Sequence, residues 1–356
     1  MKTILPTEST NVSQISVEEN PHGGLIVSYT AQESPEKASS IHLITQERNS
    51  GHWGSPTTAV ATTKKNDGYG VLYLDPRGDL RLIFSTQDPQ ITETIPLRTD
   101  WAASQIFMQR SHNYGRTWND PVLLCPEQMG WLCSSRPLST ETLRQVVPLC
   151  DPLIKRSLAL LSDDLFLNSH PSQYIETIPL NLPEEEESFD PDTPYIPTYG
   201  NTLPSITSQP DGSLLALLPS LPAGSILQAS SYDRGMTWTE TRPTSLSCPG
   251  TSIDSIILSE ENLDKEEPSN NSFTLVVHND SETDQNSLGF SVSPGDNKWL
   301  PLFQIEESSK AIFHDPRLIQ SRDGALHLLY GVDKKEIKHV CYPIEWFFSQ
   351  IADKID

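Results

Sequence analysis

A histidine and an aspartate stand next to each other near the end of the chain, at His314 and Asp315. An imidazole and a carboxylate are well suited to moving protons near neutral pH, so the pair is a candidate acid and base. Neighbouring residues on a regular strand, however, point to opposite faces of the sheet. The two side chains could act together only in a turn or a bulge, and on that condition we predict His314 and Asp315 to be catalytic.

Six short hairpins are expected to form the framework that positions such residues. In each unit two apolar strands are joined by a turn, and the clearest turns contain Gly, which supplies the positive φ that tight hairpins need. In the fifth unit a polar insertion, residues 260–271, replaces the tight turn. The units cover residues 19–29, 74–84, 138–147, 209–218, 256–277 and 321–330.

A second series of turns ends in tryptophan. Its members are Trp53, Trp118, Trp238 and Trp299. Their spacing is about 60 residues, except that the middle interval is about twice as long, so one copy has decayed. Ser162–Asp164 is the expected remnant. Such a period, with about four short strands per unit, predicts an all-β fold, a six-bladed β-propeller.

We expect this propeller to be a single domain over residues 1–356. The exception to its β-structure is a short helix at about 345–355, where Phe347, Ile351 and Ile355 recur every four residues. The stretch Pro183–Pro194 holds four successive glutamates and three prolines, and we interpret it as a solvated loop rather than a metal site.

Two of the tryptophan turns share the pattern Ser-x-Asp/Asn-x-Gly-x-Thr-Trp, at Ser111–Trp118 and Ser231–Trp238. The Asp or Asn side chain can bond back to turn amides, Gly takes the left-handed conformation, and Trp packs between strands. This turn staples a hairpin and performs no chemistry. It resembles the Asp-box, or BNR repeat, of the sialidases (neuraminidases), with degenerate copies at Glu47–Trp53 and Ser291–Trp299.

The resemblance to sialidases extends over nearly the whole chain, from about residue 15 to residue 347. It implies the same propeller fold and an exo-acting glycoside hydrolase. The further segments that carry it are Ser135–Pro137 with Val146–Leu149, Leu203–Gly212, Pro249–Asp254, and Asp315–Gly324 with Leu328–Tyr330 and Ile337–His339.

Sialidases of this type use an arginine triad to hold the substrate carboxylate, a Tyr–Glu pair as nucleophile and an Asp as acid/base. The chain departs from this pattern at three places. Asp315 stands where relatives place the tyrosine before proline, Pro219 stands where they commonly carry an arginine, and no arginine precedes Arg48.

Several site residues are nevertheless implied by the resemblance. Arg136 is the first candidate for a carboxylate clamp and Arg317 the second. Asp254 is carried over as a third catalytic candidate, although its role in relatives could be to brace a turn. Glu33, which follows the first inner strand, and Tyr330, from the last motif, are expected to contact the substrate.

The composition narrows the possible partners. The formal net charge is −22, and without a basic stripe this excludes nucleic acid and an anionic membrane surface as partners. Five cysteines without a C-x-x-C motif indicate free thiols in a reducing compartment. With no apolar run behind the first residues and none long enough to cross a membrane, we expect a cytoplasmic protein. We expect no cofactor and no metal.

Two functions remain open at this point. The chain is either an exo-acting glycoside hydrolase on sialic acid or another terminal sugar, or a catalytically inactive propeller that binds a glycan or a protein. A glycan or small sugar is the expected ligand in the first case, and a protein partner is possible in the second. Fold alone does not decide between them, because propellers host many functions.

Overall fold

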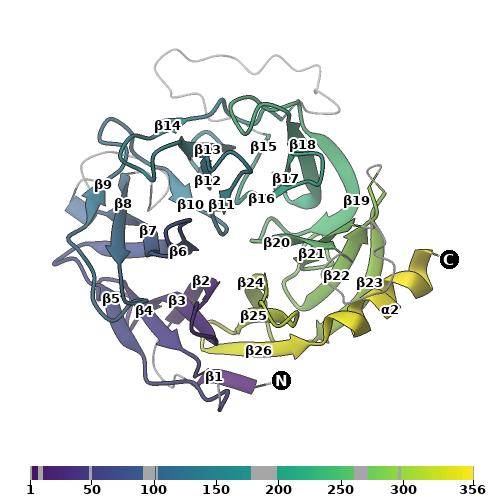
Figure 1. Cartoon of the computed structure of the whole chain (residues 1–356), viewed down its shortest axis with the longest axis horizontal. Coiled ribbons are helices and arrows are strands. Elements are labelled where there is room, and N and C mark those ends of the chain that lie inside the picture. Colours follow the sequence, from purple (N-terminus) through teal and green to yellow (C-terminus); the bar gives the residue numbers. More distant parts are fainter. Residues whose placement is uncertain are drawn as a thin grey trace.

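The computed structural model describes residues 2–6, 11–47, 50–90, 101, 103–177, 199–259, 272–295 and 298–355. Within them, six antiparallel sheets are arranged in a ring around a central axis, as Figure 1 shows. The predicted six-bladed β-propeller is therefore confirmed. Each sheet is one blade, and its innermost strand lies nearest the axis.

The first three blades follow the chain from the inside outward. The first consists of β2 (Asn11–Glu19), β3 (Leu25–Gln32), β4 (Ser40–Thr45) and β5 (Thr57–Val60). The second consists of β6 (Asn66–Leu74), β7 (Leu80–Gln87), β8 (Ser104–Ser111) and β9 (Val122–Leu123). In the third, β10 (Leu132–Cys133) and β11 (Leu138–Ser139) both pair with β12 (Gln145–Asp151), followed by β13 (Arg156–Ser162) and β14 (His170–Pro171).

The last three blades repeat this order. In the fourth, β15 (Gly200–Asn201) and β16 (Ser205–Ser208) pair with β17 (Leu214–Leu221), followed by β18 (Gly224–Ser231) and β19 (Arg242–Cys248). The fifth consists of β20 (Asp254–Ser259), β21 (Ser272–His278), β22 (Ser287–Ser293) and β23 (Leu300–Glu307). The sixth consists of β24 (Phe313–Gln320), β25 (Leu326–Val332), β26 (Glu336–Tyr342) and, outermost, β1 (Lys2–Pro6).

The ring is closed by the two ends of the chain. β1 pairs antiparallel with β26, with Lys2 opposite His339 and Pro6 opposite Glu336. Figure 1 shows the N-terminal strand beside the last blade. Main-chain hydrogen bonds thus join the first and last segments, and the sixth blade gains its fourth strand.

The six predicted hairpins each connect an innermost strand to the second strand of the same blade. Gly78, Gly212 and Gly324 in three of these turns have φ values of 86°, 81° and 86°. A residue with a Cβ avoids that region, which is why Asp-Gly and Pro-x-Gly predicted the turns. In the fifth unit β20 and β21 pair as expected, while its polar insertion lies outside the described residues, as do Pro183–Pro194.

The core is divided among six clusters of buried apolar side chains, and each cluster fills the space between two neighbouring blades. Between the first and second blades, for example, Ile41 and Leu43 of β4 pack against Leu72 of β6 and Leu82 of β7. Burial of such side chains is the main favourable term in folding, so each blade is stabilised chiefly by its neighbours.

The predicted C-terminal helix is α2 (Ile344–Ile355). Phe347 and Ile351, one helical turn apart, are buried in the cluster between the fifth and sixth blades. The helix thus covers the outer end of that cluster, next to β23 and β26 (Figure 1).

The two complete tryptophan turns connect the third and fourth strands of their blades. Ser111 Oγ accepts a hydrogen bond from the Gly115 N–H at 2.8 Å, and Asn113 Oδ1 accepts one from the Thr117 N–H at 2.8 Å. The turn at Ser231–Trp238 repeats both bonds, at 2.8 and 2.9 Å. The serine and Asp/Asn positions of the motif are thus explained by hydrogen bonds that each side chain accepts from the main-chain N–H four residues further along the same loop.

The decayed copy keeps the same bonds without glycine or tryptophan. Ser162 Oγ accepts from the Phe166 N–H at 2.8 Å, and Asp164 Oδ1 accepts from the Asn168 N–H at 2.8 Å. Leu165 and Phe166 have φ values of 60° and 65°, close to those in the complete copies. The predicted remnant at Ser162–Asp164 is therefore confirmed.

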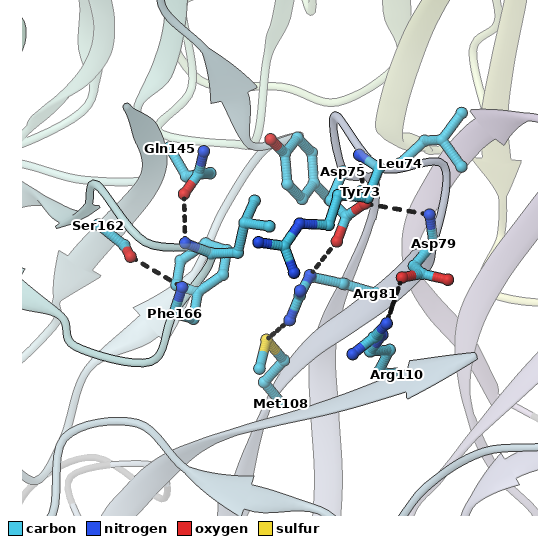
Figure 2. Close-up of polar contacts among 12 residues, drawn as sticks. Tyr73, Leu74, Asp75, Asp79, Arg81, Met108, Arg110, Gln145, Ser162 and Phe166 are labelled. Carbon is cyan, nitrogen blue, oxygen red and sulfur yellow. Dashed lines mark hydrogen bonds and ion pairs between the residues drawn. The ribbon is translucent and has the colours of Figure 1, made fainter. Parts of the chain in front are cut away.

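Phe166 stands where the complete turns have glycine, a position at which a Cβ on Gly115 would lie only 2.7 Å from Leu43 Cδ1. In Figure 2 its ring lies beside the Arg81 side chain, whose guanidinium carbon is 5.8 Å from the ring centre. Arg81 is itself buried and donates from Nε to Asp75 at 2.8 Å. The decayed turn is therefore compensated by a cation–π contact to the second blade.

Candidate functional site

Three innermost strands contain a left-handed residue near their first end, at the third or fourth position. Gln14, Tyr69 and Asp315 have φ values of 55°, 52° and 49°, and each lies where the pairing register of β2, β6 or β24 shifts. Leu203, just before β16, has a φ of 42°. This region is uncommon for residues with a Cβ, so surrounding contacts must hold it. These bulges form one end of the central channel.

A cavity of about 280 Å³, here called cavity A, lies among these bulges. It receives residues from all six blades, as expected of a site on the propeller axis. Its lining consists of Ser13, Gln14, Ile15, Tyr69, Gly70, Val71, Cys133, Ser134, Leu203, Thr251, Ser252, Gln285, His314, Asp315, Arg317 and Lys334.

Asp315 has both carboxylate oxygens occupied. Oδ2 accepts from the Gln14 N–H at 2.7 Å and from His314 Nδ1 at 3.0 Å, and Oδ1 accepts from Ser252 Oγ at 2.9 Å. Burial alone would raise its pKa, but these bonds and the charge of Arg317 hold the pKa of Asp315 well below its ordinary value. It is therefore an ionised acceptor and has no proton to give.

His314 is held at both ring nitrogens. The Lys334 N–H donates to Nε2 at 3.1 Å, which assigns the ring proton to Nδ1 and directs it to Asp315. The ring packs on Gly331, its pairing partner in β25, where an added Cβ would overlap it. The predicted pair thus meets in a bulge, as its cooperation required, but its polar atoms are bound to the protein.

Arg317, the second candidate for a carboxylate clamp, lines cavity A, but its guanidinium is enclosed. Nε donates to the carbonyl of Ile15 at 2.7 Å, Nη1 to that of Pro316 at 2.8 Å, and Nη2 to that of Ser134 at 2.7 Å. A longer bond reaches the Ile253 carbonyl. Arg317 therefore ties the inner strands together and presents no free fork to a substrate carboxylate.

Arg136 and Asp254 lie in a second cavity of about 320 Å³, here called cavity B. Its lining comes from later positions on the same inner strands, such as Leu318 and Gln320 of β24, so it occupies a different level of the channel. Asp254 is buried, which raises its pKa although the charge of Arg317 and the Leu318 N–H oppose the shift. The structure does not bring this pair to cavity A.

Glu33 and Tyr330 lie outside both cavities. Glu33 is exposed between β3 and β4 and pairs with Lys37. Tyr330 is buried in the cluster between the fifth and sixth blades, and its hydroxyl donates to Glu306 Oε1 at 2.6 Å. Neither residue is placed where the expected substrate contact would need it, because Glu33 follows the second strand of its blade and Tyr330 faces the neighbouring blade.

Sequence reasoning missed several other polar residues that line cavity A. Gln14 and Tyr69 give no signal, because a left-handed φ at a residue other than glycine is set by tertiary contacts. The Gln14 side chain accepts from the Tyr69 N–H and from Thr30 Oγ1, both at 2.6 Å, and so couples the first two blades. Gln285 and Lys334 come from loops between the second and third strands of their blades, where the sequence shows no pattern.

Other chemistry within the described residues is limited. No group of three His, Cys, Asp or Glu side chains in the described part of the chain is placed to share a metal ion. All five cysteines are free thiols, and only Cys341 is exposed. No helix among the described residues has the length and apolar character needed to cross a membrane.

The fold and its bulged central cavity define a six-bladed propeller of the sialidase type. The BNR repeat-like domain model matches residues 23–328, and the chain belongs to that family. No curated protein matches it.

Solved structures of sialidases share the architecture. A Hadza microbial sialidase is 16% identical, with a TM-score of 0.68; the match covers 94% of this chain but 66% of that one, just under two thirds. The intramolecular trans-sialidase from Ruminococcus gnavus, in complex with oseltamivir carboxylate, is 14% identical, with a TM-score of 0.71, covering 94% and 95%.

The likeness is not confined to sialidases. An α-L-arabinanase from Penicillium chrysogenum, complexed with arabinobiose, is 15% identical, with a TM-score of 0.63, covering 97% of this chain and 98% of that one. At these identities the likeness shows the shared fold alone.

Proposed function

We propose that this chain is a sialidase-like propeller that binds an uncharged terminal sugar in cavity A and does not hydrolyse sialosides. The observation that carries the proposal is the state of three charged or titratable side chains that line the cavity. His314, Asp315 and Arg317 are each hydrogen-bonded to the protein through the atoms that chemistry would need.

The Arg317 guanidinium is a poor clamp for a carboxylate for this reason. A bidentate pair needs two parallel N–H groups aimed at the ligand, and the nitrogens of Arg317 donate to main-chain carbonyls instead. A sialic acid carboxylate would also face the ionised Asp315 in the same cavity. An uncharged ligand avoids that repulsion.

The remaining polar side chains of cavity A suit hydroxyl groups. The Ser13 hydroxyl and the Gln285 amide line the cavity, and neither has a hydrogen-bond partner within the described protein. The Tyr69 ring stands edge-on to Trp101, with 5.0 Å between ring centres. A few placed polar groups beside aromatic surface are typical of small-molecule sites, and 280 Å³ is near the lower end of their roughly 300–1,000 Å³. One sugar unit is the expected occupant.

A second candidate function is hydrolysis of a neutral glycoside. Tyr69 is the phenol in cavity A that would have to serve as the nucleophile, but its pKa is raised, chiefly by burial and in smaller part by the nearby charge of Asp315. A raised pKa makes a weaker nucleophile at neutral pH. Most glycosidases also need two carboxyl groups across the scissile bond, and Asp315 is the single carboxylate among the described residues of cavity A.

Isothermal titration of the purified protein with neutral monosaccharides, including arabinose and galactose, tests the proposal. We expect one of them to bind, and Gln285→Ala to weaken that binding about tenfold, the value of one hydrogen bond of roughly 1.4 kcal/mol. Gln304→Ala, an exposed amide on β23, is the matched control and should bind as the unaltered protein does. Equal binding by both variants, or tight binding of N-acetylneuraminate alone, would contradict the proposal.

A further inference from the structure

Leu143, in the hairpin turn of the third blade, has a backbone conformation that leucine rarely adopts. Its N–H donates to the Thr140 carbonyl at 2.8 Å, and its φ is 64°. The same position in the turns of the first, second, fourth and sixth blades is a glycine, namely Gly23, Gly78, Gly212 and Gly324. The Leu143 residue is 60% exposed, so burial does little to offset the backbone cost that a Cβ brings there. The hairpin itself therefore does not require leucine.

Two neighbouring Asp-box turns also present apolar side chains that the turns do not need. The turn bonds use the serine and the Asp/Asn, so the x positions of Ser-x-Asp/Asn-x-Gly-x-Thr-Trp are free to vary. In the third and fourth blades they hold Leu167, Tyr232 and Met236, which are 83%, 77% and 36% exposed. The corresponding positions of the second blade hold the polar residues His112 and Arg116.

Side-chain hydrogen bonds join the three turns into one surface. Arg144 of the hairpin donates from Nε and Nη2 to Asp163 at 2.7 and 2.8 Å. Arg234 of the fourth-blade turn donates from Nη1 to Thr142 Oγ1 at 3.1 Å. The hairpin is thus tied to the turns on both sides, and this surface is preorganised for binding. It is here called the apolar patch, and it consists of Leu143, Leu167, Tyr232 and Met236.

The apolar patch is surrounded by acidic side chains. The three turns carry four carboxylates and two arginines, over residues 141–144, 163–168 and 232–236. Arg144 is already paired with Asp163. The whole chain carries a net charge of −22, so a second copy of the chain or an anionic membrane would be repelled, and a basic partner would be attracted. Exposed apolar residues with a polar rim are typical of protein–protein contacts.

We propose that the apolar patch is a docking surface for a partner protein that presents aliphatic or aromatic side chains flanked by lysine or arginine. The patch and cavity A lie at opposite ends of the propeller. Cavity A lies near the first ends of β2, β6 and β24, whereas the hairpin turns follow the last residues of the innermost strands. A partner on the patch therefore leaves cavity A open to its own ligand.

Selection of random short peptides displayed on phage against the purified chain, followed by fluorescence anisotropy of the enriched peptides, tests this surface. The enriched peptides should combine apolar residues with lysine or arginine. Leu143→Gly should weaken their binding about tenfold, the effect of losing one interface hot spot. Enrichment of acidic peptides, no enrichment, or unchanged binding by Leu143→Gly would overturn the proposal.

The same variant separates binding from folding. Because Leu143→Gly introduces the residue that the other turns carry, its urea midpoint should equal or exceed that of the unaltered protein. Met129→Ser is the matched control. Met129 is 43% exposed, and the next residue, Gly130, bonds to Ser104 at the start of β8, at the other end of its blade. This variant should bind the peptides unchanged. So should Gln285→Ala, because cavity A is a separate site whose failure is distinguishable from failure of the patch.

Other occupants of the apolar patch would give different results. Sedimentation velocity of the unaltered chain should show a monomer, and phosphatidylcholine vesicles should not bind it. Self-association that is lost in Leu143→Gly would identify a second copy of the chain as the occupant. Vesicle binding that is lost in Leu143→Gly would identify a lipid surface. Either result would overturn the assignment to a basic protein partner.

Discussion

His314 Nδ1 lies 3.0 Å from Asp315 Oδ2, although the two residues are neighbours on a strand. The left-handed φ of Asp315, 49°, and the register shift after His314 bring the two side chains together. An imidazole hydrogen-bonded to a carboxylate is the arrangement found in many acid–base catalytic pairs. Yet the Lys334 N–H occupies His314 Nε2, and Gln14 and Ser252 occupy Asp315. The pair therefore fastens the sixth blade to its neighbours around cavity A.

Replacing Asp315 should reduce stability. Asp315→Asn keeps the size of the side chain. One of the two accepting oxygens, however, becomes an NH₂ group, which cannot accept from Gln14, Ser252 or His314. We expect the free energy of unfolding to fall by about 2–4 kcal/mol, the cost of leaving buried donors unpaired. Urea denaturation measures it. Asp120→Asn, an exposed aspartate after the Asp-box of the second blade, is the control and should change little. An equal, small effect of both would contradict this role.

The contribution of Asp315 should depend on pH in one direction. Its folded-state pKa is held well below the ordinary value near 3.9. Its stabilisation is then fully present above that unfolded value and is lost as pH falls through the folded one. The difference in unfolding free energy between the unaltered protein and Asp315→Asn should therefore narrow from about pH 5 to about pH 3. A constant difference over this range would show that the carboxylate is not specially stabilised.

Arg317 should be a structural residue of the propeller axis. Arg317→Lys keeps the charge but cannot reach the carbonyls of Ile15, Ser134 and Pro316 together, and it leaves them without donors. We expect a loss of about 2–4 kcal/mol in unfolding free energy. Arg242→Lys, at an exposed position on β19, is the matched control. If Arg317→Lys is as stable as the control, the guanidinium bonds do not hold the axis.

The decayed Asp-box should depend on Phe166. Phe166→Ala removes a ring that is 5% exposed and contacts Arg81 and Tyr73. We expect a loss of about 3–5 kcal/mol in unfolding free energy, as for other buried phenylalanines. Leu167→Ala, the next residue and 83% exposed, should be nearly neutral. Similar values for the two variants would mean that Phe166 does not replace the packing of the missing tryptophan turn.

The sequence predicts the fold well because its signals are local. Turns such as those at Gly78 and Gly324 need a residue with positive φ, and glycine supplies it. Ser162 and Asp164 keep their hydrogen bonds to main-chain N–H groups even where Gly and Trp are lost. The candidate site is predicted less well because its signals are tertiary. Nothing in the sequence near Gln14 shows that its N–H meets a carboxylate more than 300 residues away, and nothing near Arg317 shows that carbonyls surround it.

The placement of Arg136 and Asp254 has the same physical cause. The resemblance implies Arg136 as a carboxylate clamp and Asp254 as a catalytic residue, and the structure places both in cavity B, among residues of the inner strands. Which level of the channel each residue reaches depends on the bulges of β2, β6 and β24, and those are not visible in the sequence. Glu33 and Tyr330 are placed elsewhere because Glu33 lies in the exposed loop after the second strand of its blade, and Tyr330 lies on the second strand of the sixth blade and packs toward the fifth.

The most direct test of the central claim is the release of fluorophore from a fluorogenic N-acetylneuraminoside by the purified chain near neutral pH. Because His314, Asp315 and Arg317 of cavity A are hydrogen-bonded to the protein, we predict no release above that of buffer alone, and no change on Asp315→Asn. Release that exceeds the buffer rate and disappears in Asp315→Asn would contradict the account, since it would show that Asp315 acts on substrate.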